Sequence, residues 1–170
     1  MLWPDEKDSN RERLAEELLR RILDGMGITA EIEIRRSEGN FILSIEGCTE
    51  AGRVIGKDGN ILHHIQFLLN LMLMKKLKSR MSVVVDVEGY RERRWAKLLN
   101  QAKEAAGKVK RREKPLVLEP MHAADRRTIH IALRDDPFVE TMSVNEDRET
   151  GMKSVRISLR KESPPPVETE

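Results

Sequence analysis

Apolar residues recur at two different spacings in the first part of this 170-residue chain. Leucine and isoleucine return every fourth position over 14–22, which predicts an amphipathic helix over about 10–24. Apolar and polar residues then alternate over 28–34 and again over 41–45. This period of two is typical of half-buried strands, and the polar turn between the two runs predicts an antiparallel hairpin.

The segments that follow complete a first unit. Residues 49–55 predict a short helix with Thr49 as its N-cap, because a threonine hydroxyl accepts from an early backbone N–H. Residues 60–77 predict a long helix that is largely apolar, and the valine-rich residues 82–87 predict a strand. The order is therefore α-β-β-α-α-β, and we place this unit at residues 11–88.

A second unit begins with a long, strongly charged helix, predicted over 91–112. Trp95 lies on the apolar stripe of this helix, so we expect its ring in the core. The remaining elements are a short strand, a helix and two strands, predicted at 116–118, 121–134, 138–144 and 154–159. The second unit reads α-β-α-β-β and takes up residues 89–162.

The predicted fold class is therefore α+β, with two small α/β sandwich domains. We expect a flexible N-terminus over residues 1–10 and a disordered, proline-containing tail over 163–170. The longest apolar stretch, 65–74, is interrupted by polar residues and is too short to cross a bilayer. The N-terminus has no signal-peptide pattern, so we predict a cytoplasmic protein without membrane insertion.

Composition narrows the possible functions. The charged fraction is 35%, but the formal net charge is only +2, so any case for nucleic-acid binding depends on where the basic residues lie. Cys48 is the only cysteine, which excludes an intramolecular disulfide and a CxxC metal motif. We find no phosphate-binding P-loop, no metal-ligand spacing and no Ser-His-Asp order. The sequence therefore predicts no enzyme, no catalytic or metal-binding residue and no cofactor.

The first informative motif is Gly56-Lys57-Asp58-Gly59, which joins two predicted helices. Two glycines allow a sharp backbone turn, and the free N–H groups of the following helix, which begins at Asn60, point into the same place. Lys57 adds a mobile positive charge there, and Arg53 lies one turn earlier. These features favour a clamp on a sugar-phosphate backbone.

With its β-β-α-α-β surroundings, this stretch resembles a KH domain of the type II order. The resemblance implies that single-stranded RNA lies across the loop, with its bases in an apolar groove beside the following helix. The residues that carry this prediction are Arg53, Gly56, Lys57, Asp58, Gly59 and Asn60. Asp58 is unfavourable next to a phosphate, although a carboxylate near a helix N-terminus is stabilised.

The second motif places Arg126 and His130 four residues apart, on one face of a predicted helix. An arginine forks onto phosphate, and a histidine stacks on a base or donates a hydrogen bond. Arg127 and Arg134 extend the basic surface. With the flanking 118–121 and 136–141 segments, this motif resembles an R-three-H domain, which implies single-stranded nucleic-acid binding.

A KH unit followed directly by an R-three-H unit is similar to the bacterial Jag/KhpB family, over about residues 12–160. Two departures stand out: we expect the protein to lack the extra N-terminal Jag domain and linker of many members, and the loop over 144–153 is more acidic. The resemblance implies an RNA chaperone or post-transcriptional regulator of cell elongation, division and envelope homeostasis. Expected partners are single-stranded RNA or DNA, and a small KH-only protein or another copy of the chain. The alternative is a protein-interaction adaptor at the envelope or membrane-insertion machinery.

Overall fold

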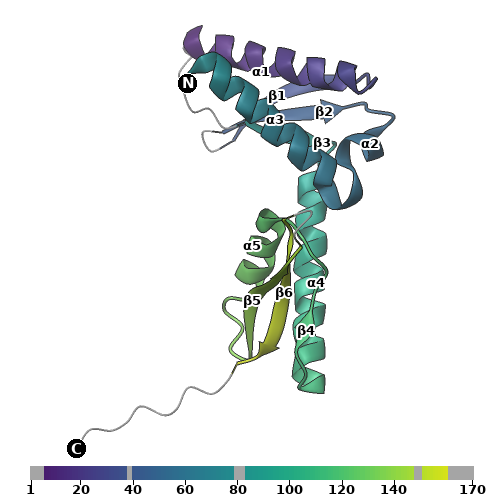
Figure 1. Cartoon of the computed structure of the whole chain (residues 1–170), viewed down its shortest axis with the longest axis vertical. Helices are drawn as coiled ribbons and strands as arrows, with labels where there is room; N and C mark the ends of the chain where they lie inside the picture. The colour runs from purple at the N-terminus through teal and green to yellow at the C-terminus, as the bar shows by residue number, and fades with distance from the viewer. Residues whose placement is uncertain (1–5, 38–39, 79–82, 148–150, 161–170) are drawn as a thin grey trace, which may run out of the picture. The chain divides into compact units, whose positions relative to one another are not determined.

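The computed structural model of this chain describes residues 6–37, 40–78, 83–147 and 151–160 (Figure 1). The chain divides into two compact units, Met1–Arg91 and Glu92–Glu170. Both contain a three-stranded sheet and helices, so the predicted α+β class with two small domains is confirmed. None of the described helices combines the length and the apolar character needed to cross a bilayer.

The first unit contains the predicted order α-β-β-α-α-β, with one short 3-10 turn inserted. Its elements are α1 (Glu6–Gly25), β1 (Glu31–Ser37), β2 (Asn40–Glu46), α2 (Ala51–Ile55), the turn η1 (Lys57–Gly59), α3 (Asn60–Leu77) and β3 (Val83–Val87). The sheet order is β1-β2-β3, in which β1 and β2 are antiparallel and β2 and β3 are parallel. A parallel pair needs a long crossover, and α2 and α3 supply it.

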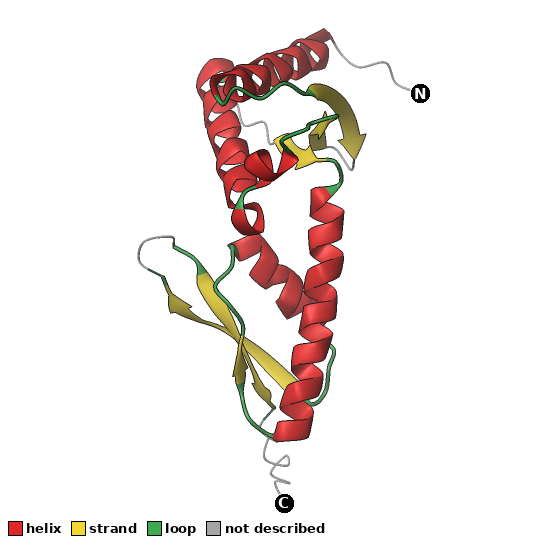
Figure 2. Cartoon of the chain, turned by 90° about the vertical axis from the view of Figure 1, so that its right-hand side faces the viewer, coloured by secondary structure: helices red, strands yellow, loops and turns green. Residues whose placement is uncertain are grey.

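Helices α1 and α3 cover one face of this sheet (Figure 2). The core between these layers contains Leu19, Leu43, Leu69 and Val85, which have no exposed surface. Burial of each such side chain contributes about 1.5–3 kcal/mol, so this layer contact stabilises the unit.

The outer edge of β3 is closed by polar side chains from the helices. Asn70 donates to the carbonyl of Val83 (3.0 Å) and accepts from its N–H (2.8 Å). Gln66 accepts from the N–H of Val85 (3.0 Å), and Nε of Arg91 donates to the carbonyl of Val85 (2.7 Å). Gln66 and Asn70, the two polar residues within the apolar helix α3, therefore take the place of a neighbouring strand. Their hydrogen bonds block further strand pairing at this edge.

The second unit contains the predicted order α-β-α-β-β. Its elements are α4 (Tyr90–Arg112), whose first two residues belong to the first unit, β4 (Leu116–Val117), α5 (Ala123–Ala132), β5 (Val139–Glu146) and β6 (Lys153–Leu159). The antiparallel sheet has the order β4-β6-β5. Helices α4 and α5 lie on one side of it (Figure 2) and enclose a core that includes Leu98, Ile129 and Ile157.

One partly buried ion pair joins the two helices of this unit. Arg94 of α4 donates from Nε and Nη2 to Oδ2 of Asp125 in α5, at 3.1 and 2.9 Å. Both side chains are less than one-fifth exposed, so the pair is shielded from solvent. Removal of either partner would leave a charge in a poorly hydrated position.

Three local predictions differ from the structure. Helix α1 begins at Glu6, so residues 6–10 are helical rather than part of a flexible arm. Glu50, not Thr49, occupies the N-cap position of α2, and no side-chain cap bond is made there. Trp95 is 53% exposed, because the core of the second unit begins one turn later, at Leu98.

Some predictions lie outside the described residues. These are the N-terminal residues 1–5, the tail over 163–170, the tip of the first hairpin at 38–39 and part of the acidic loop at 148–150.

Candidate nucleic-acid interface

The backbone of the glycine loop adopts conformations that side chains rarely allow. Gly56 has φ 70° and ψ −176°, a region that only glycine occupies readily. A Cβ on Gly56 would lie 2.6 Å from Cγ1 of Ile61, well inside contact distance. Asp58 also has a positive φ of 52°, in the left-handed region that Asp tolerates better than most residues. The loop therefore requires glycine at its first position for both conformation and space.

Gly59 serves a different purpose from Gly56. It is buried, has φ 80°, and a Cβ there would lie 2.9 Å from both Oη and Cε1 of Tyr90. The ring of Tyr90 thus packs directly on the loop backbone. Lys57 and Asp58, between the two glycines, are exposed to solvent. The loop is anchored at its end and presents its two polar side chains outward.

The start of α3 keeps backbone donors available next to Lys57. Gly59 occupies the N-cap position and has no side chain to cap the first N–H groups. These groups and the positive end of the helix dipole favour an anion. Asn60 begins the helix, and its carbonyl accepts a hydrogen bond from Nδ1 of His64 at 2.7 Å.

Arg53 is held by neighbours rather than directed only outward. Its Nη1 contacts Oε2 of Glu50 at 2.6 Å, and its Nη2 donates to the carbonyl of Met26 at 3.0 Å. The guanidinium therefore links α2 to the connection between α1 and β1. A phosphate at this position would share Arg53 with these partners.

The structure brings Arg126 and His130 together on one face of α5, against β5. Nε of Arg126 donates to Oγ of Ser143 at 3.2 Å, and Nε2 of His130 lies 3.0 Å from the same hydroxyl. Nδ1 of His130 lies 2.7 Å from Oγ1 of Thr141. A second guanidinium nitrogen of Arg126, Nη1, donates to the carbonyl of Met121 at 2.9 Å. The pair and two strand hydroxyls form one hydrogen-bonded cluster.

This cluster affects the chemistry of His130. Desolvation by burial, followed by the positive charge of Arg126, lowers the pKa of His130 below its usual value. The ring is therefore neutral near pH 7, and both of its nitrogens are engaged with hydroxyls of β5. In this geometry His130 positions the strand beside Arg126, and the guanidinium remains the charged group of the cluster.

Sequence reasoning did not identify Thr141 and Ser143 as partners of this pair. The available signal was the spacing of two hydroxyl residues two apart on a predicted strand, which places both on one face. Arg127 and Arg134 are exposed, and within the described parts of the chain neither side chain makes a hydrogen bond or ion pair. Arg127 adds positive charge on α5, and Arg134 adds it just after the helix.

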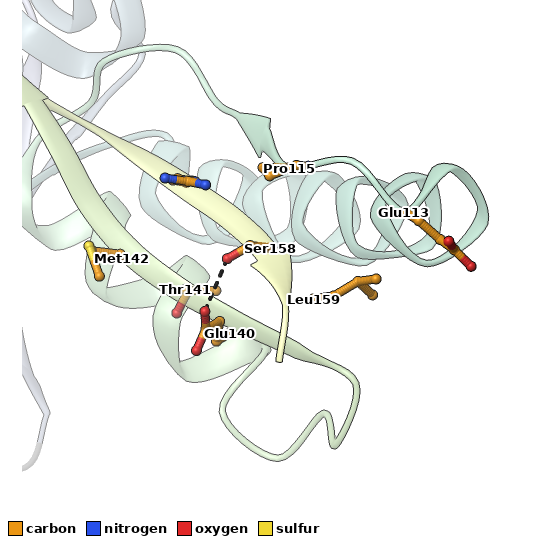
Figure 3. Close-up of a pocket in the computed structure, with 8 residues that line it drawn as sticks. Glu113, Pro115, Glu140, Thr141, Met142, Ser158 and Leu159 are labelled. Carbon is orange, nitrogen blue, oxygen red and sulfur yellow. Dashed lines mark hydrogen bonds between the residues drawn. The ribbon is translucent and has the colours of Figure 1, made fainter. Parts of the chain in front are cut away.

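A separate hollow of about 370 Å³ lies on the sheet of the second unit (Figure 3). Its lining includes Glu113, Glu140, Met142, Arg156 and Ser158, and Ser158 donates to Glu140 at 3.3 Å. Two carboxylates and one guanidinium do not favour a phosphate.

Among the residues described, no group of three or more His, Cys, Asp or Glu is arranged to hold a metal ion.

Comparison with known domain families agrees with this architecture. The KH domain of the KhpA/KhpB type matches residues 12–87, and the R-three-H domain matches residues 96–153. The chain is thus a two-domain protein that combines a KH and an R-three-H module. Neither family is enzymatic, in agreement with the prediction that the chain is not an enzyme.

Several curated proteins share both modules. The RNA-binding protein KhpB of Clostridium symbiosum is 37% identical over 149 residues, which cover 86% of this chain and 65% of the relative. Those of Lactiplantibacillus plantarum and Bacillus subtilis are each 30% identical, over 82% and 68% of this chain and 42% and 55% of the relatives. The chain belongs to the KhpB family. It spans about two-thirds or less of the length of these curated relatives.

Proposed function

We propose that the chain binds single-stranded RNA through two surfaces, one on each unit. The observation that carries this proposal is the glycine loop, whose backbone is restricted to glycine at Gly56 while Lys57 is exposed. The names of the KhpB relatives support RNA as the ligand. Single-stranded DNA carries the same charged phosphates and is a weaker candidate, since it lacks the 2′-hydroxyl.

On the first unit, the phosphates lie over the loop, next to Lys57 and the uncapped N–H groups of α3. Arg53 and Asn60 border this position, and Asp58 opposes it by its charge. Ile61, directly after the loop, is 38% exposed and offers an apolar contact for a base. The loop thus binds the backbone, which gives affinity without sequence preference.

On the second unit, Arg126, Arg127 and Arg134 supply the positive charge that attracts phosphate. His130 contributes by position, because its ring nitrogens engage Thr141 and Ser143. Arg127 and Arg134 are the more informative residues to substitute, since within the described chain neither side chain makes a hydrogen bond or ion pair that the substitution would break.

Fluorescence anisotropy with a labelled, unstructured RNA oligonucleotide tests both surfaces. Lys57→Asp reverses one charge at the loop and should weaken binding at least tenfold, since two adjacent carboxylates then repel the phosphate. Lys75→Asp makes the same charge change at an exposed position near the other end of α3 and serves as the matched control. Equal affinities for these two variants would refute the role of the loop.

The double variant Arg127→Gln/Arg134→Gln tests the second surface in the same assay. Removal of each phosphate contact should lower the slope of log affinity against log salt by about 0.7 for a single strand. An unchanged slope would leave the second unit outside the RNA interface.

The finer role that we propose is that of an RNA chaperone or post-transcriptional regulator in the cytoplasm, linked to cell elongation, division and envelope homeostasis. This rests on the family resemblance. A strand-annealing assay tests the chaperone activity: the chain should accelerate pairing of two complementary RNAs, and Lys57→Asp should abolish the acceleration.

One surface favours an additional protein partner, as an adaptor would need. Phe67, Leu71 and Met74 recur along one face of α3 and are each 46–63% exposed. An exposed apolar stripe of this kind marks an interaction site. We propose that it binds a second KH domain, either in a KH-only protein or in another copy of this chain.

Sedimentation of the chain alone and with a KH-only relative tests this partner. Leu71→Glu should abolish association, whereas Lys76→Glu, at an exposed polar position of the same helix, should not. If both variants and the unmodified chain sediment as monomers in every mixture, the stripe does not bind a second KH domain and this proposal fails.

A further inference from the structure

An exposed aromatic ring lies where α5 leads into β5. Phe138 directly precedes β5 and is 63% exposed, although the next residue, Val139, is completely buried. Exposure of a large aromatic side chain leaves unused the stabilisation that its burial would provide. The position therefore calls for an explanation beyond packing.

The backbone that carries this ring is held on both sides. The N–H of Phe138 donates to Oδ1 of Asp136 at 3.0 Å. The carbonyl of Phe138 accepts from the N–H of Arg160 at 2.9 Å. The exposed ring thus projects from a fixed backbone position rather than from an unsupported loop.

A lysine covers one face of the ring and limits its orientation. Nζ of Lys110, on α4, lies 5.0 Å from the ring centroid and 2.7 Å from Oδ2 of Asp136. Burial acts to raise the pKa of Asp136, but the hydrogen bonds from Lys110 and from the N–H of Phe138 hold that pKa below its usual value. Asp136 is therefore charged near pH 7 and keeps Lys110 in place. Because Lys110 covers one face of the Phe138 ring, most of its 63% exposure must come from the opposite face, which is open to solvent.

The charges around the ring do not form a phosphate site. Lys110 on α4 and Arg160 after β6 are balanced by Asp135, Asp136 and Glu140, which flank Phe138 in the chain. A polyanionic backbone gains little here, whereas a neutral, flat group gains from an open aromatic face.

We infer that Phe138 is a stacking platform for a base of the bound single-stranded RNA. This inference rests on the proposed function, and it adds a base contact to a surface otherwise made of charged groups. Phe138 directly precedes β5, the strand that carries Thr141 and Ser143, the partners of His130.

Binding of the full chain to the labelled RNA oligonucleotide tests the platform. Phe138→Ala should weaken binding about tenfold, as loss of one stacked base does. Because no phosphate contact is removed, the salt dependence should not change. Phe138→Trp should retain the affinity, whereas Phe138→Leu, which keeps an apolar side chain without a π-face, should lose it. Met142→Ala removes an equally exposed apolar side chain from β5 and should have no effect.

The outcomes separate this inference from the proposed function. If Lys57→Asp weakens binding but Phe138→Ala does not, RNA binding stands and the platform is wrong. If Phe138→Leu binds as the unmodified chain does, the contact is not stacking. If Phe138→Ala changes only the sedimentation of the chain, the ring is a protein contact and the inference is overturned. If the unmodified chain binds no RNA, both proposals fail.

Discussion

Replacement of Gly56 by alanine tests whether the loop depends on glycine as its geometry implies. The substitution forces a side chain into φ 70° and ψ −176°, at a cost of about 1–3 kcal/mol. The new Cβ would also lie 2.6 Å from Cγ1, 2.9 Å from Cδ1 and 2.9 Å from Cβ of Ile61. Overpacking of this kind costs about 1–3 kcal/mol more. We therefore expect a total loss of about 2–6 kcal/mol.

A second substitution separates the two contributions. Ile61→Ala removes Cγ1 and Cδ1 but keeps Cβ, so it relieves part of the clash and none of the backbone cost. The double variant Gly56→Ala/Ile61→Ala should then be more stable than the sum of the single effects predicts, by about 1 kcal/mol. Gly52→Ala is the matched control, because its Cβ meets nothing within 4 Å in α2. It should be neutral or stabilising by up to about 1 kcal/mol.

Urea unfolding followed by circular dichroism measures these changes. Native-state hydrogen exchange at the amides of Leu43 and Val85, both in the core of the first unit, assigns the loss to that unit. If Gly56→Ala is as stable as Gly52→Ala, the loop tolerates a side chain and the geometric argument is refuted. Strict additivity in the double variant would instead exclude the contact with Ile61.

Three further predictions concern the second unit. Nuclear magnetic resonance titration should give His130 a pKa below 6.5, and Arg126→Ala should raise that pKa. Because the pKa of His130 is lower in the folded chain than in the unfolded chain, the unfolded chain takes up the proton first as the pH falls. The free energy of unfolding of the unmodified chain should therefore fall as the pH drops from about 6.5 to the folded pKa. Asp125→Ala removes the ion-pair partner that α5 supplies to the partly buried Arg94 and should cost about 2 kcal/mol. Urea unfolding followed through tryptophan fluorescence measures this, and a loss below measurement error would mean that the pair is solvated. Gly107→Ala should raise the free energy of unfolding in the same assay by about 0.5–1 kcal/mol, because Gly107 lies within α4 and alanine favours a helix. The added Cβ would meet only the mobile Nη1 of Arg111, at 3.3 Å. A loss of stability would contradict this prediction.

Local spacing was sufficient to predict the elements. The order of helices and strands in both units follows from periods near four and of two, and the bounds differ from the structure by only a few residues. The glycine motif predicted a tight turn before a helix, and the structure contains one at η1. These features depend on neighbours in the chain, so they are visible in the chain alone.

Contacts between distant segments required the tertiary structure. Spacing placed Trp95 on the apolar stripe of α4, but the core of the second unit begins one turn later on that helix, at Leu98, so the ring is exposed. Gln66 and Asn70 interrupted an apolar run without an evident reason until they were found at the edge of β3.

The same distinction holds for the candidate interface. The sequence determined that Arg126 and His130 share a helix face, because four residues make about one helical turn. Only the folded unit decided that β5 engages both ring nitrogens of His130 and leaves Phe138 exposed beside Lys110. Periodicity specifies which way a side chain points from its own element. How far the facing layer extends, and which groups it presents, depends on residues far away in the chain.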